Sequence, residues 1–248
     1  MSDQAAQTWA ERAQAELGAS RRFRELYHEL QIVEAHPEVL RRVRQAERDE
    51  DRHALLCARM AIELGHDTGF ADPAEHAHPT TPPWRDHLSE ADRVLLDVVL
   101  MCCITESLNA SLLNTIYQNA PNSEAGQLVH EILKDEVQHA QIGWAHLSAE
   151  HQRRDCSFVA DYLVQMFEIA VKDELFLPAV DTADEHLYHY GVMPHHLRLS
   201  QFYETFYCVI LPGLERFGVE TRALVEWVES QIESGSLKSD LQRDAVNP

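Results

Sequence analysis

The chain has few basic residues. Its 248 residues include 21 Lys and Arg against 41 Asp and Glu, a formal net charge of -20 at pH 7. This excess of negative charge repels phosphate backbones and anionic lipid, so no nucleic acid and no membrane is expected as a partner. Long apolar runs are also missing, and none occurs before Glu16, so we expect no signal peptide, no membrane span and a cytoplasmic protein.

Cysteine is scarce, and its spacing fits no cross-linked framework. Five cysteines, an odd number without a Cys-x-x-Cys pair, do not predict a disulfide scaffold or a rubredoxin-type iron centre. We expect free thiols, with Cys102 and Cys103 packed as small apolar side chains. Strand-like alternation is missing as well, and the apolar residues recur at helical spacing, which predicts an all-α chain.

One acidic motif is present twice. Residues 49–54 read Asp-Glu-Asp-Arg-His-Ala, and residues 135–140 read Asp-Glu-Val-Gln-His-Ala. A Glu and a His three residues apart lie on one face of a helix, so each copy presents a carboxylate and an imidazole in the same direction. Three further Glu-x-x-His pairs are Glu25/His28, Glu63/His66 and Glu75/His78. Two such pairs on facing helices can converge on metal.

The sequence around the two copies separates them from the other pairs. Each copy interrupts an apolar helical stripe, formed by Val39, Val43, Ala46, Cys57, Met60 and Leu64 in the first case and by Val129, Ile132, Gly143 and Leu147 in the second. A buried carboxylate beside a buried imidazole is costly unless it is paired or bound to metal. We therefore predict Glu50, His53, Glu136 and His139 as metal ligands.

Two other helices each carry one acid on an apolar stripe. Glu106 is the only charged residue on the stripe within 95–116, so its burial is expected. Upstream, Glu16 shares a face with Phe23 and Leu30, whereas Glu25, the reserve candidate, points away from that apolar direction. Each acid precedes its motif by the length of one helix, a turn and a return helix. We predict Glu16 and Glu106 as the remaining ligands.

The resulting order is Glu, Glu-x-x-His, Glu, Glu-x-x-His on four helices. It resembles the dimetal carboxylate proteins of the ferritin-like superfamily, which place a long connection between helices two and three. The closest resemblance, to bacterial ferritin-like diiron proteins of the oxygenase and oxidase branch, is carried by residues 103–106 and 134–140 and covers about residues 8–150. It implies a ferritin-like four-helix bundle, with the Pro- and His-rich residues 65–88 as the crossover.

The resemblance also implies roles for Asp49 and Asp135. Each would accept a hydrogen bond from the imidazole of the other copy, His139 and His53 respectively, because ligating histidines need such an orienting partner. Length and ligand spacing are also similar to those of the aldehyde-deformylating oxygenases. The chain departs from them at Arg22, which stands where their spacing would put the first Glu, and this argues against that activity.

Charge counting favours a pair of divalent ions. Four carboxylates would balance two such ions and leave the reduced centre neutral in an apolar core. Oxygen and imidazole ligands without thiolate suit iron or manganese better than structural zinc. We expect two iron ions, cycling between Fe²⁺ and Fe³⁺, with O2 as co-substrate, and leave manganese as the alternative.

The chain is expected to divide into three parts. Residues 7–152 form the dimetal bundle, residues 153–235 form an extension of about three helices packed on it, and residues 236–248 form a tail. The extension has the aromatic stripes of a packed layer and is expected to cover a substrate pocket. Polar or small candidates for that pocket are Ser20, Cys57 and Asn109.

These expectations define a leading function and two alternatives. The leading hypothesis is a non-haem diiron oxygenase or oxidase that hydroxylates, N-oxygenates or desaturates a small organic substrate. It needs a separate electron donor, a ferredoxin or a reductase, because no flavin or nicotinamide fingerprint is present; a homodimer is compatible with it. The alternatives are iron oxidation or peroxide detoxification of the ferritin and rubrerythrin kind, and a metal-free helical interaction module.

Overall fold

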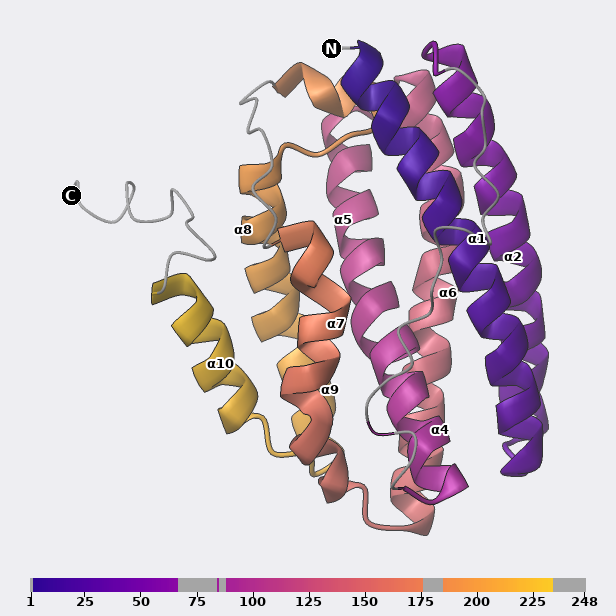
Figure 1. Cartoon of the computed structure of the whole chain (residues 1–248), viewed down its shortest axis with the longest axis vertical. Helices are drawn as coiled ribbons and strands as arrows, with labels where there is room; N and C mark the ends of the chain where they lie inside the picture. The colour runs from indigo at the N-terminus through magenta and orange to yellow at the C-terminus, as the bar shows by residue number, and fades with distance from the viewer. Residues whose placement is uncertain (1, 67–83, 85–87, 176–184, 234–248) are drawn as a thin grey trace.

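The computed structural model describes residues 2–66, 84, 88–175 and 185–233, and every regular element within these ranges is helical (Figure 1). This confirms the all-α prediction. Most of the expected crossover at 65–88 and all of the tail at 236–248 lie outside the described residues. Four long rods run side by side: α1 (Ser2–Ile32), α2 (Pro37–Glu63), a third rod from Glu90 to Asn119, and α6 (Glu124–Arg153).

Local sequence explains where α2, the third rod and α6 begin. His36 caps α2 by accepting a hydrogen bond from the Glu38 backbone N–H, and Pro37 occupies the first helical position, where its missing N–H costs nothing. Ser89 and Ser123 cap the third rod and α6 in the same way, with their hydroxyl oxygens accepting backbone hydrogen bonds. Helix α1 begins at Ser2, five residues before the expected start of the bundle at residue 7.

The third rod is not a regular α-helix. It consists of α4 (Glu90–Val98), the π-helical segment η1 (Val99–Thr105) and α5 (Glu106–Asn119). The Thr105 hydroxyl donates to the carbonyl of Leu100, five residues earlier, at 3.0 Å. A π-turn accommodates one extra residue and therefore changes which side chains face inward after it. This segment was not expected from the sequence, and it ends immediately before Glu106.

Gly143 on α6 explains how closely η1 approaches. A Cβ at this position would lie 2.7 Å from both the backbone nitrogen and the sulfur of Cys103. Only a glycine allows α6 and η1 to pack at this separation. Cys102 and Cys103 are buried free thiols, as expected from the sequence.

The apolar core of the four rods is split by a polar layer. One cluster, at the end of the rods where α1 begins, includes Trp9, Met60, Leu113 and Ile132. A second cluster, at the opposite end, includes Phe23, Leu30, Val43, Val98 and Ile142. Along α1, α2 and α6, the predicted ligands lie in sequence between the residues of these two clusters. The polar layer is therefore shielded by apolar side chains above and below.

The remaining helices are η2 (Ser157–Tyr162), α7 (Leu163–Leu175), η3 (Glu185–Tyr190), α8 (His195–Thr205), η4 (Phe206–Ile210), α9 (Leu211–Glu215) and α10 (Arg222–Glu233). Of these helices, α7, η3, α8 and η4 contact the third rod, while η2 and α10 pack on α7 and α9 packs on η4. Phe167, Phe202 and Phe206 form one apolar cluster with Leu96 and Ile104 of the third rod. The short 3-10 helix η3 lies between α7 and α8 along the chain.

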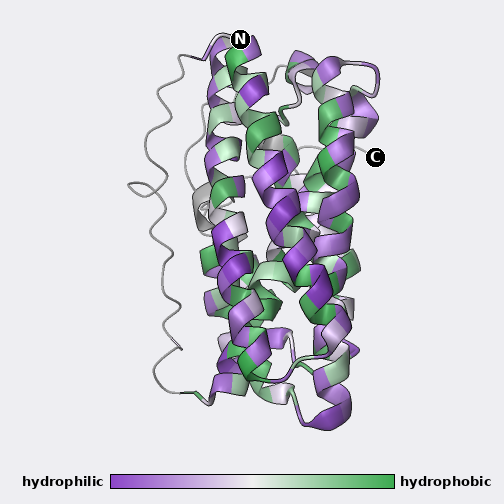
Figure 2. Ribbon diagram, turned by 90° about the vertical axis from the view of Figure 1, so that its right-hand side faces the viewer, coloured by the Kyte–Doolittle hydropathy of each residue, from purple (hydrophilic) through white to green (hydrophobic). Residues whose placement is uncertain are grey.

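Hydropathy along the rods agrees with their packing. In Figure 2, hydrophilic and hydrophobic residues alternate along each long helix, as expected for helices that bury one face. By length and composition alone, Glu90–Asn119 could span a membrane, but 67% of its most apolar window is buried inside the protein.

Candidate metal centre

Six predicted side chains meet in the polar layer of the bundle. Glu16 comes from α1, Glu50 and His53 from α2, and Glu106 from the start of α5. Glu136 and His139 come from α6. All six are buried, with relative exposures from 0% to 6%. The reserve candidate Glu25 is not among them: its exposed carboxylate pairs with Arg22 at 3.1 Å on the surface of α1.

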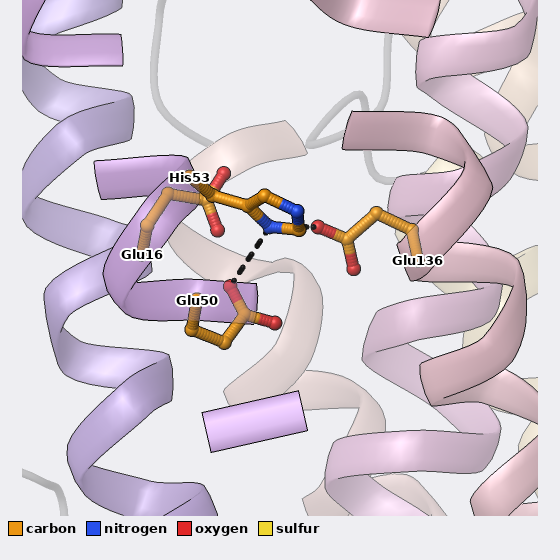
Figure 3. A group of neighbouring side chains, drawn as sticks. All are labelled: Glu16, Glu50, His53 and Glu136. Atoms are coloured by element: carbon orange, nitrogen blue, oxygen red, sulfur yellow. Dashed lines mark ion pairs between the residues drawn. The ribbon is translucent and has the colours of Figure 1, made fainter. Parts of the chain in front are cut away.

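The six residues form two overlapping groups of potential metal ligands. One contains Glu16, Glu50, His53 and Glu136 (Figure 3), and the other contains Glu50, Glu106, Glu136 and His139. Within each group, one ligand atom from every residue lies within 4.8 Å of the others. Glu50 and Glu136 belong to both groups, so each can bridge two ions, while Glu16 and Glu106 can each bind one ion. The sequence motif alone did not assign these two roles.

Both imidazoles direct Nδ1 toward the carboxylates. His53 Nδ1 lies 3.4 Å from oxygens of both Glu50 and Glu136. His139 Nδ1 lies 2.8 Å from Glu50 Oε1 and 3.2 Å from Glu136 Oε2. Because Nδ1 of each ring faces the shared carboxylates, this nitrogen is the one available to a metal ion.

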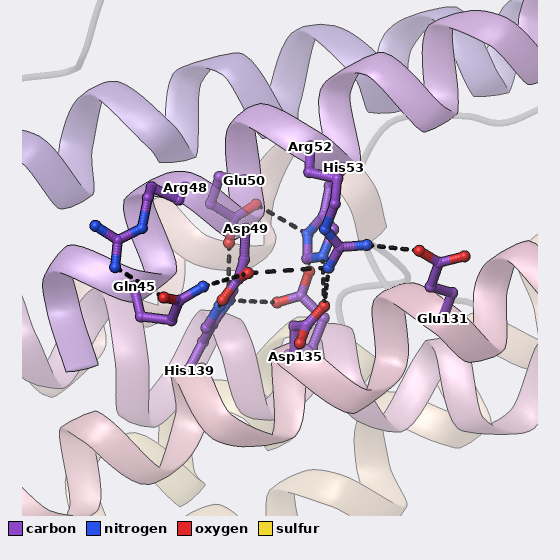
Figure 4. Close-up of polar contacts among 10 residues, drawn as sticks. Gln45, Arg48, Asp49, Glu50, Arg52, His53, Glu131, Asp135 and His139 are labelled. Atoms are coloured by element: carbon purple, nitrogen blue, oxygen red, sulfur yellow. Dashed lines mark hydrogen bonds and ion pairs between the residues drawn. The ribbon is translucent and has the colours of Figure 1, made fainter.

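The opposite nitrogen of each ring faces an aspartate from the other copy of the motif (Figure 4). His53 Nε2 lies 3.1 Å from Asp135 Oδ2, which is a hydrogen-bond distance. His139 Nε2 lies 3.6 Å from Asp49 Oδ2, which is longer than a normal hydrogen bond. This crossed arrangement is the one the resemblance implies for Asp49 and Asp135.

Arg52 links the two aspartates at the surface of α2 and α6. Its Nη2 donates to Asp135 and lies 3.9 Å from Asp49, and its Nη1 pairs with Glu131 at 2.7 Å (Figure 4). Arg52 therefore binds Asp135, which faces His53, and approaches Asp49, which faces His139. No signal in the sequence indicated this link, because a basic residue next to a histidine has no distinctive spacing.

In the metal-free centre, burial and neighbouring charges raise the pKa values of the two unshared carboxyl groups. Burial raises the pKa of Glu16 well above its ordinary value, and the nearby Glu50 and Glu136 raise it further. Burial likewise raises the pKa of Glu106, with Glu136 and Glu50 adding to the effect. In both cases burial and the neighbouring carboxylates favour the neutral form of the carboxyl group.

The pKa values of the two imidazoles are raised, which favours their protonated, cationic forms. Burial lowers the pKa of His53, but Glu136 and Glu50 outweigh it and raise the pKa to about 10. Burial also lowers the pKa of His139, but Asp49, Glu136 and Glu50 raise it well above its ordinary value. For Glu136, burial raises the pKa, but hydrogen bonds from His139 and His53 lower it well below the ordinary range. Two imidazolium ions thus face the shared carboxylates.

The donor set matches the charge of two divalent ions. Four carboxylates, two neutral imidazoles and two divalent ions sum to zero. Two such ions bound by the six residues would therefore leave no net charge in the apolar core.

The buried polar atoms of the centre face one another. Both oxygens of Glu50, Oε1 of Glu136 and Nδ1 of His53 are buried, and the ion-pair contacts that they make are with each other and with His139. Several buried donor atoms that converge on one point are typical of a site that binds an ion. Oxygen and imidazole donors, with no thiolate in either ligand group, suit iron or manganese.

A cavity of about 340 Å³ adjoins the centre on the side of α1 and α5. Glu16, Glu50 and Glu106 line it at one place, and Asn109 lines it one turn after Glu106. Helices α7 and α8 of the extension contribute Val171 and Phe202 to its wall. The extension therefore lines a pocket beside the predicted ligands.

Two of the three predicted pocket residues do not line this cavity. Ser20 is buried and donates a hydrogen bond from its hydroxyl to Asp51 at 2.6 Å, which ties α1 to α2 instead. Cys57 packs in the apolar cluster around Trp9, and burial raises the pKa of its thiol. Arg22, noted for its position in the sequence, forms an ion pair with buried Asp97 of α4 at 2.8 Å.

No family model, curated protein or solved structure matches this chain. The buried groups of acidic and histidine residues are nevertheless compatible with a metal site of the ferritin-like kind.

Proposed function

We propose that the chain is a ferritin-like diiron protein that activates O2 to oxidise a small organic substrate. The observation that carries this proposal is the cavity lined by Glu16, Glu50 and Glu106, because it places open space directly beside the predicted iron ligands. A protein that only stores or oxidises iron needs a path for ions, whereas an oxygenase needs room for an organic molecule beside the metal.

The donor set supports iron as the cofactor. Glu16 and His53 would complete one site, Glu106 and His139 the other, and Glu50 and Glu136 would be shared. When bound, two iron ions would supply the electrons needed to reduce O2 and the oxidising power to attack the substrate. Manganese satisfies the same donor chemistry and is the alternative.

The remaining residues of the centre have supporting roles. Asp135 accepts a hydrogen bond at 3.1 Å and so keeps the proton of His53 on Nε2, leaving Nδ1 free to bind metal. Asp49 faces Nε2 of His139 in the same sense at a longer distance. Phe23 packs its ring edgewise against His139, with centroids 5.3 Å apart, and shields that side from water.

Electrons would come from a separate protein, a ferredoxin or a reductase. The proposal requires this donor because the sequence contains no flavin or nicotinamide fingerprint. Arg52 and Glu131 form the surface over His53 and Asp135. A donor bound at this surface would have a short route for electrons from solvent to the centre.

The test begins with metal stoichiometry. The anaerobic full chain would be loaded with Fe²⁺, desalted and analysed for bound iron; two iron ions per chain are expected. The loaded protein would then be mixed with O2 while oxygen uptake and the visible spectrum are recorded, with and without a pool of candidate organic substrates. Faster decay of an oxygen-dependent absorption band when substrate is present, together with an oxidised product, would support the oxygenase.

Other outcomes separate the alternatives. Oxygen uptake that follows ferrous iron and is indifferent to organic compounds would favour iron oxidation or peroxide detoxification. Failure to bind metal in stoichiometric amounts, with the same thermal stability before and after chelation, would contradict the proposal and favour a metal-free helical module. Glu124→Ala, an exposed substitution on α6, provides a control for nonspecific loss of iron.

A further inference from the structure

The solvent-facing side of α2 carries arginine and aliphatic side chains on one stripe. Its members recur every three or four residues and so lie on the same face of the helix: Arg48, Arg52, Leu55, Arg59 and Ile62. Leu55 and Ile62 are 74% and 49% exposed. Aliphatic side chains of this kind can be covered by a partner protein, while the cations between them select its charge.

Two cations on this side of the bundle have no carboxylate partner among the residues that the structure describes. Arg48 is exposed and donates to the neutral Oε1 of Gln45 at 2.8 Å. Lys134, on the neighbouring helix α6, is exposed and forms no ion pair within the same ranges. The sequence places one of these cations directly before each copy of the repeated motif. Both can therefore bind carboxylates of another molecule without breaking an ion pair of this chain.

The other arginines of the stripe are already paired. Arg52 binds Glu131 and Asp135, and Arg59 binds Glu63 at 3.1 Å. The unbalanced positive charge of this surface therefore comes from Arg48 and Lys134. We call the surface defined by Arg48, Arg52, Leu55 and Lys134 the α2–α6 face. On a chain with a formal net charge of -20, a local excess of cations orients an acidic partner.

A chain of polar contacts joins Arg48 to one predicted histidine ligand (Figure 4). Arg48 donates to Gln45, and Nε2 of Gln45 donates to Oδ1 of Asp49 at 2.9 Å. The other carboxylate oxygen of Asp49 lies 3.6 Å from Nε2 of His139. The side chain of Asp49 is 15% exposed, so it is the only side chain between His139 and the surface at this point.

A shorter chain joins the α2–α6 face to the other histidine (Figure 4). Arg52 donates to Asp135, and Oδ2 of Asp135 lies 3.1 Å from Nε2 of His53. The side chain of Asp135 is 26% exposed, whereas that of His53 is fully buried. A protein bound on this face would therefore lie close to both predicted histidine ligands.

The cavity beside the centre lies on a different side. Its wall comes mainly from α1, α5, α7 and α8, and α2 contributes only Glu50. Helices α7 to α10 lie across the bundle from α2 (Figure 1). A partner on the α2–α6 face therefore approaches the histidines without covering the cavity. Such a partner is placed to supply electrons while a substrate occupies the cavity.

We propose that the α2–α6 face docks a small acidic iron–sulfur protein of the ferredoxin class, which delivers electrons one at a time. The role of this partner rests on the proposed function. In two encounters, two reduced ferredoxins each lose one electron, and two ferric ions of the centre each gain one and become ferrous. Docking itself depends only on the surface and can be measured without turnover.

The experiment measures binding of an acidic plant-type ferredoxin to the full chain. Fluorescence anisotropy of labelled, oxidised ferredoxin gives the dissociation constant at low salt, with the chain metal-free and loaded with ferric iron. Arg48→Glu and Lys134→Glu should each weaken binding about fivefold, because an attraction becomes a repulsion of similar size, and the double variant about 25-fold. Added salt should reduce these differences, since it screens exposed charges.

Matched controls separate docking from a general effect of charge. Arg216→Glu makes the same charge change at an exposed residue after α9, and should alter ferredoxin affinity by less than about twofold. Basic cytochrome c provides a partner of opposite charge, and none of the variants should bind it more weakly. Thermal unfolding and iron counts show whether each variant keeps its fold and its centre. Lys134 belongs to neither polar chain, so Lys134→Glu tests the face even if Arg48→Glu disturbs Asp49.

A kinetic comparison tests the delivery of electrons. Stopped-flow absorbance follows reduction of the ferric protein by reduced ferredoxin, which should be slowed in the double variant by about the factor found for binding. Dithionite, a small reductant that needs no docking surface, should reduce parent and double variant at rates within about twofold of each other. Slower reduction by both reagents would show a damaged centre instead of a lost docking surface, and would contradict the assignment.

Several other results would overturn the assignment. It fails if ferredoxin does not bind the parent chain at low salt, if Arg216→Glu weakens binding as much as the two face variants, or if ferredoxin reduces the double variant as fast as the parent. Charge-dependent binding to a chain that takes up no metal would contradict the proposed function but retain the docking face. Iron-dependent oxidation of a substrate, with ferredoxin binding unaffected by the changes at Arg48 and Lys134, would do the reverse.

Discussion

The two halves of the bundle supply the same ligands but differ in how they hold them. The first half, α1 and α2, is built of regular helices, whereas the second half, the third rod and α6, contains the π-helical segment before Glu106. Four residues after the motif histidine, the first half has Cys57 and the second has Gly143. The second half thus holds its ligands through close packing of two helix backbones, whereas the first half holds its ligands through packing of side chains.

The two copies of the motif also differ in polar support. Arg52 in the first copy reaches across to Asp135, while the equivalent residue of the second copy, Gln138, is exposed. His53 consequently has a nearer acceptor than His139, at 3.1 Å against 3.6 Å. The comparison teaches that a repeated ligand motif fixes the donors, while their rigidity comes from residues that are not repeated.

The largest expected effect separates shared from unshared carboxylates. Glu136→Ala and Glu50→Ala each remove a ligand of both sites and should reduce bound iron from about two ions per chain to almost none. Glu16→Ala and Glu106→Ala affect one site each and should retain about one ion. Metal analysis after desalting gives the counts. Retention of one ion in Glu136→Ala would show that the shared role is wrong.

A smaller effect distinguishes the two orienting aspartates. Asp135→Asn and Asp49→Asn should each weaken metal affinity by about 10- to 100-fold, because the charged acceptor of the ring N–H is replaced by a neutral amide oxygen. The loss should be larger for Asp135→Asn, since its distance to the imidazole is shorter. Competition with a chelator under anaerobic conditions measures both values. Equal losses, or a larger loss at Asp49, would contradict the difference between the halves.

The close packing of α6 against η1 in the second half can be tested by substituting Gly143. Gly143→Ala would place a Cβ 2.7 Å from the backbone nitrogen of Cys103, so it should lower the free energy of unfolding by about 1–3 kcal/mol. Gly18→Ala on α1 meets no atom within 4 Å and should raise it by about 0.5–1 kcal/mol, as alanine is the better helix former. Urea unfolding measures both. Similar free energies for the two variants would refute the close contact.

The smallest effect concerns a buried histidine of the second half. Seven residues after the motif histidine, the first half has Met60 and the second has His146, whose pKa burial lowers to about 4. Because the unfolded chain takes up a proton here before the folded one does, stability is lost as the pH falls below about 6.5, and the loss is complete below about pH 4.

His146→Met would make the two halves alike at this position and remove that loss. Between pH 7 and 5.5 the parent should lose about 1 kcal/mol of unfolding free energy more than the variant does. Urea midpoints across this range provide the measurement. Parallel pH profiles for the two proteins would show that His146 does not contribute.

Much of this architecture was accessible from the sequence. Helical spacing predicted the all-α chain, and the interrupted apolar stripes identified Glu50, His53, Glu136 and His139, which the structure brings together. Glu16 was selected over Glu25 on its direction and on its spacing to Glu50, and of the two only Glu16 reaches the centre. These inferences depend on local periodicity, which a sequence records directly.

Other features depend on contacts between distant segments. The π-helical segment has no distinctive composition, since it reads as a continuous apolar helix. The contacts of Arg52 with Asp135 and of Arg12 with Gly191 join parts of the chain far apart in sequence. Ser20 and Cys57 failed as pocket residues because helix orientation, not residue type, decides what lines a cavity.

The π-helical segment has a consequence for how this rod can change over generations. Each residue of an α-helix turns it by about 100°, so one inserted residue would normally rotate everything beyond it away from its neighbours. Here the wide turn at Val99–Thr105 absorbs such an insertion locally. Deleting one residue within it should therefore restore a regular helix while turning Glu106 or the α4 face out of register, so the centre and its supporting end could not both survive the deletion.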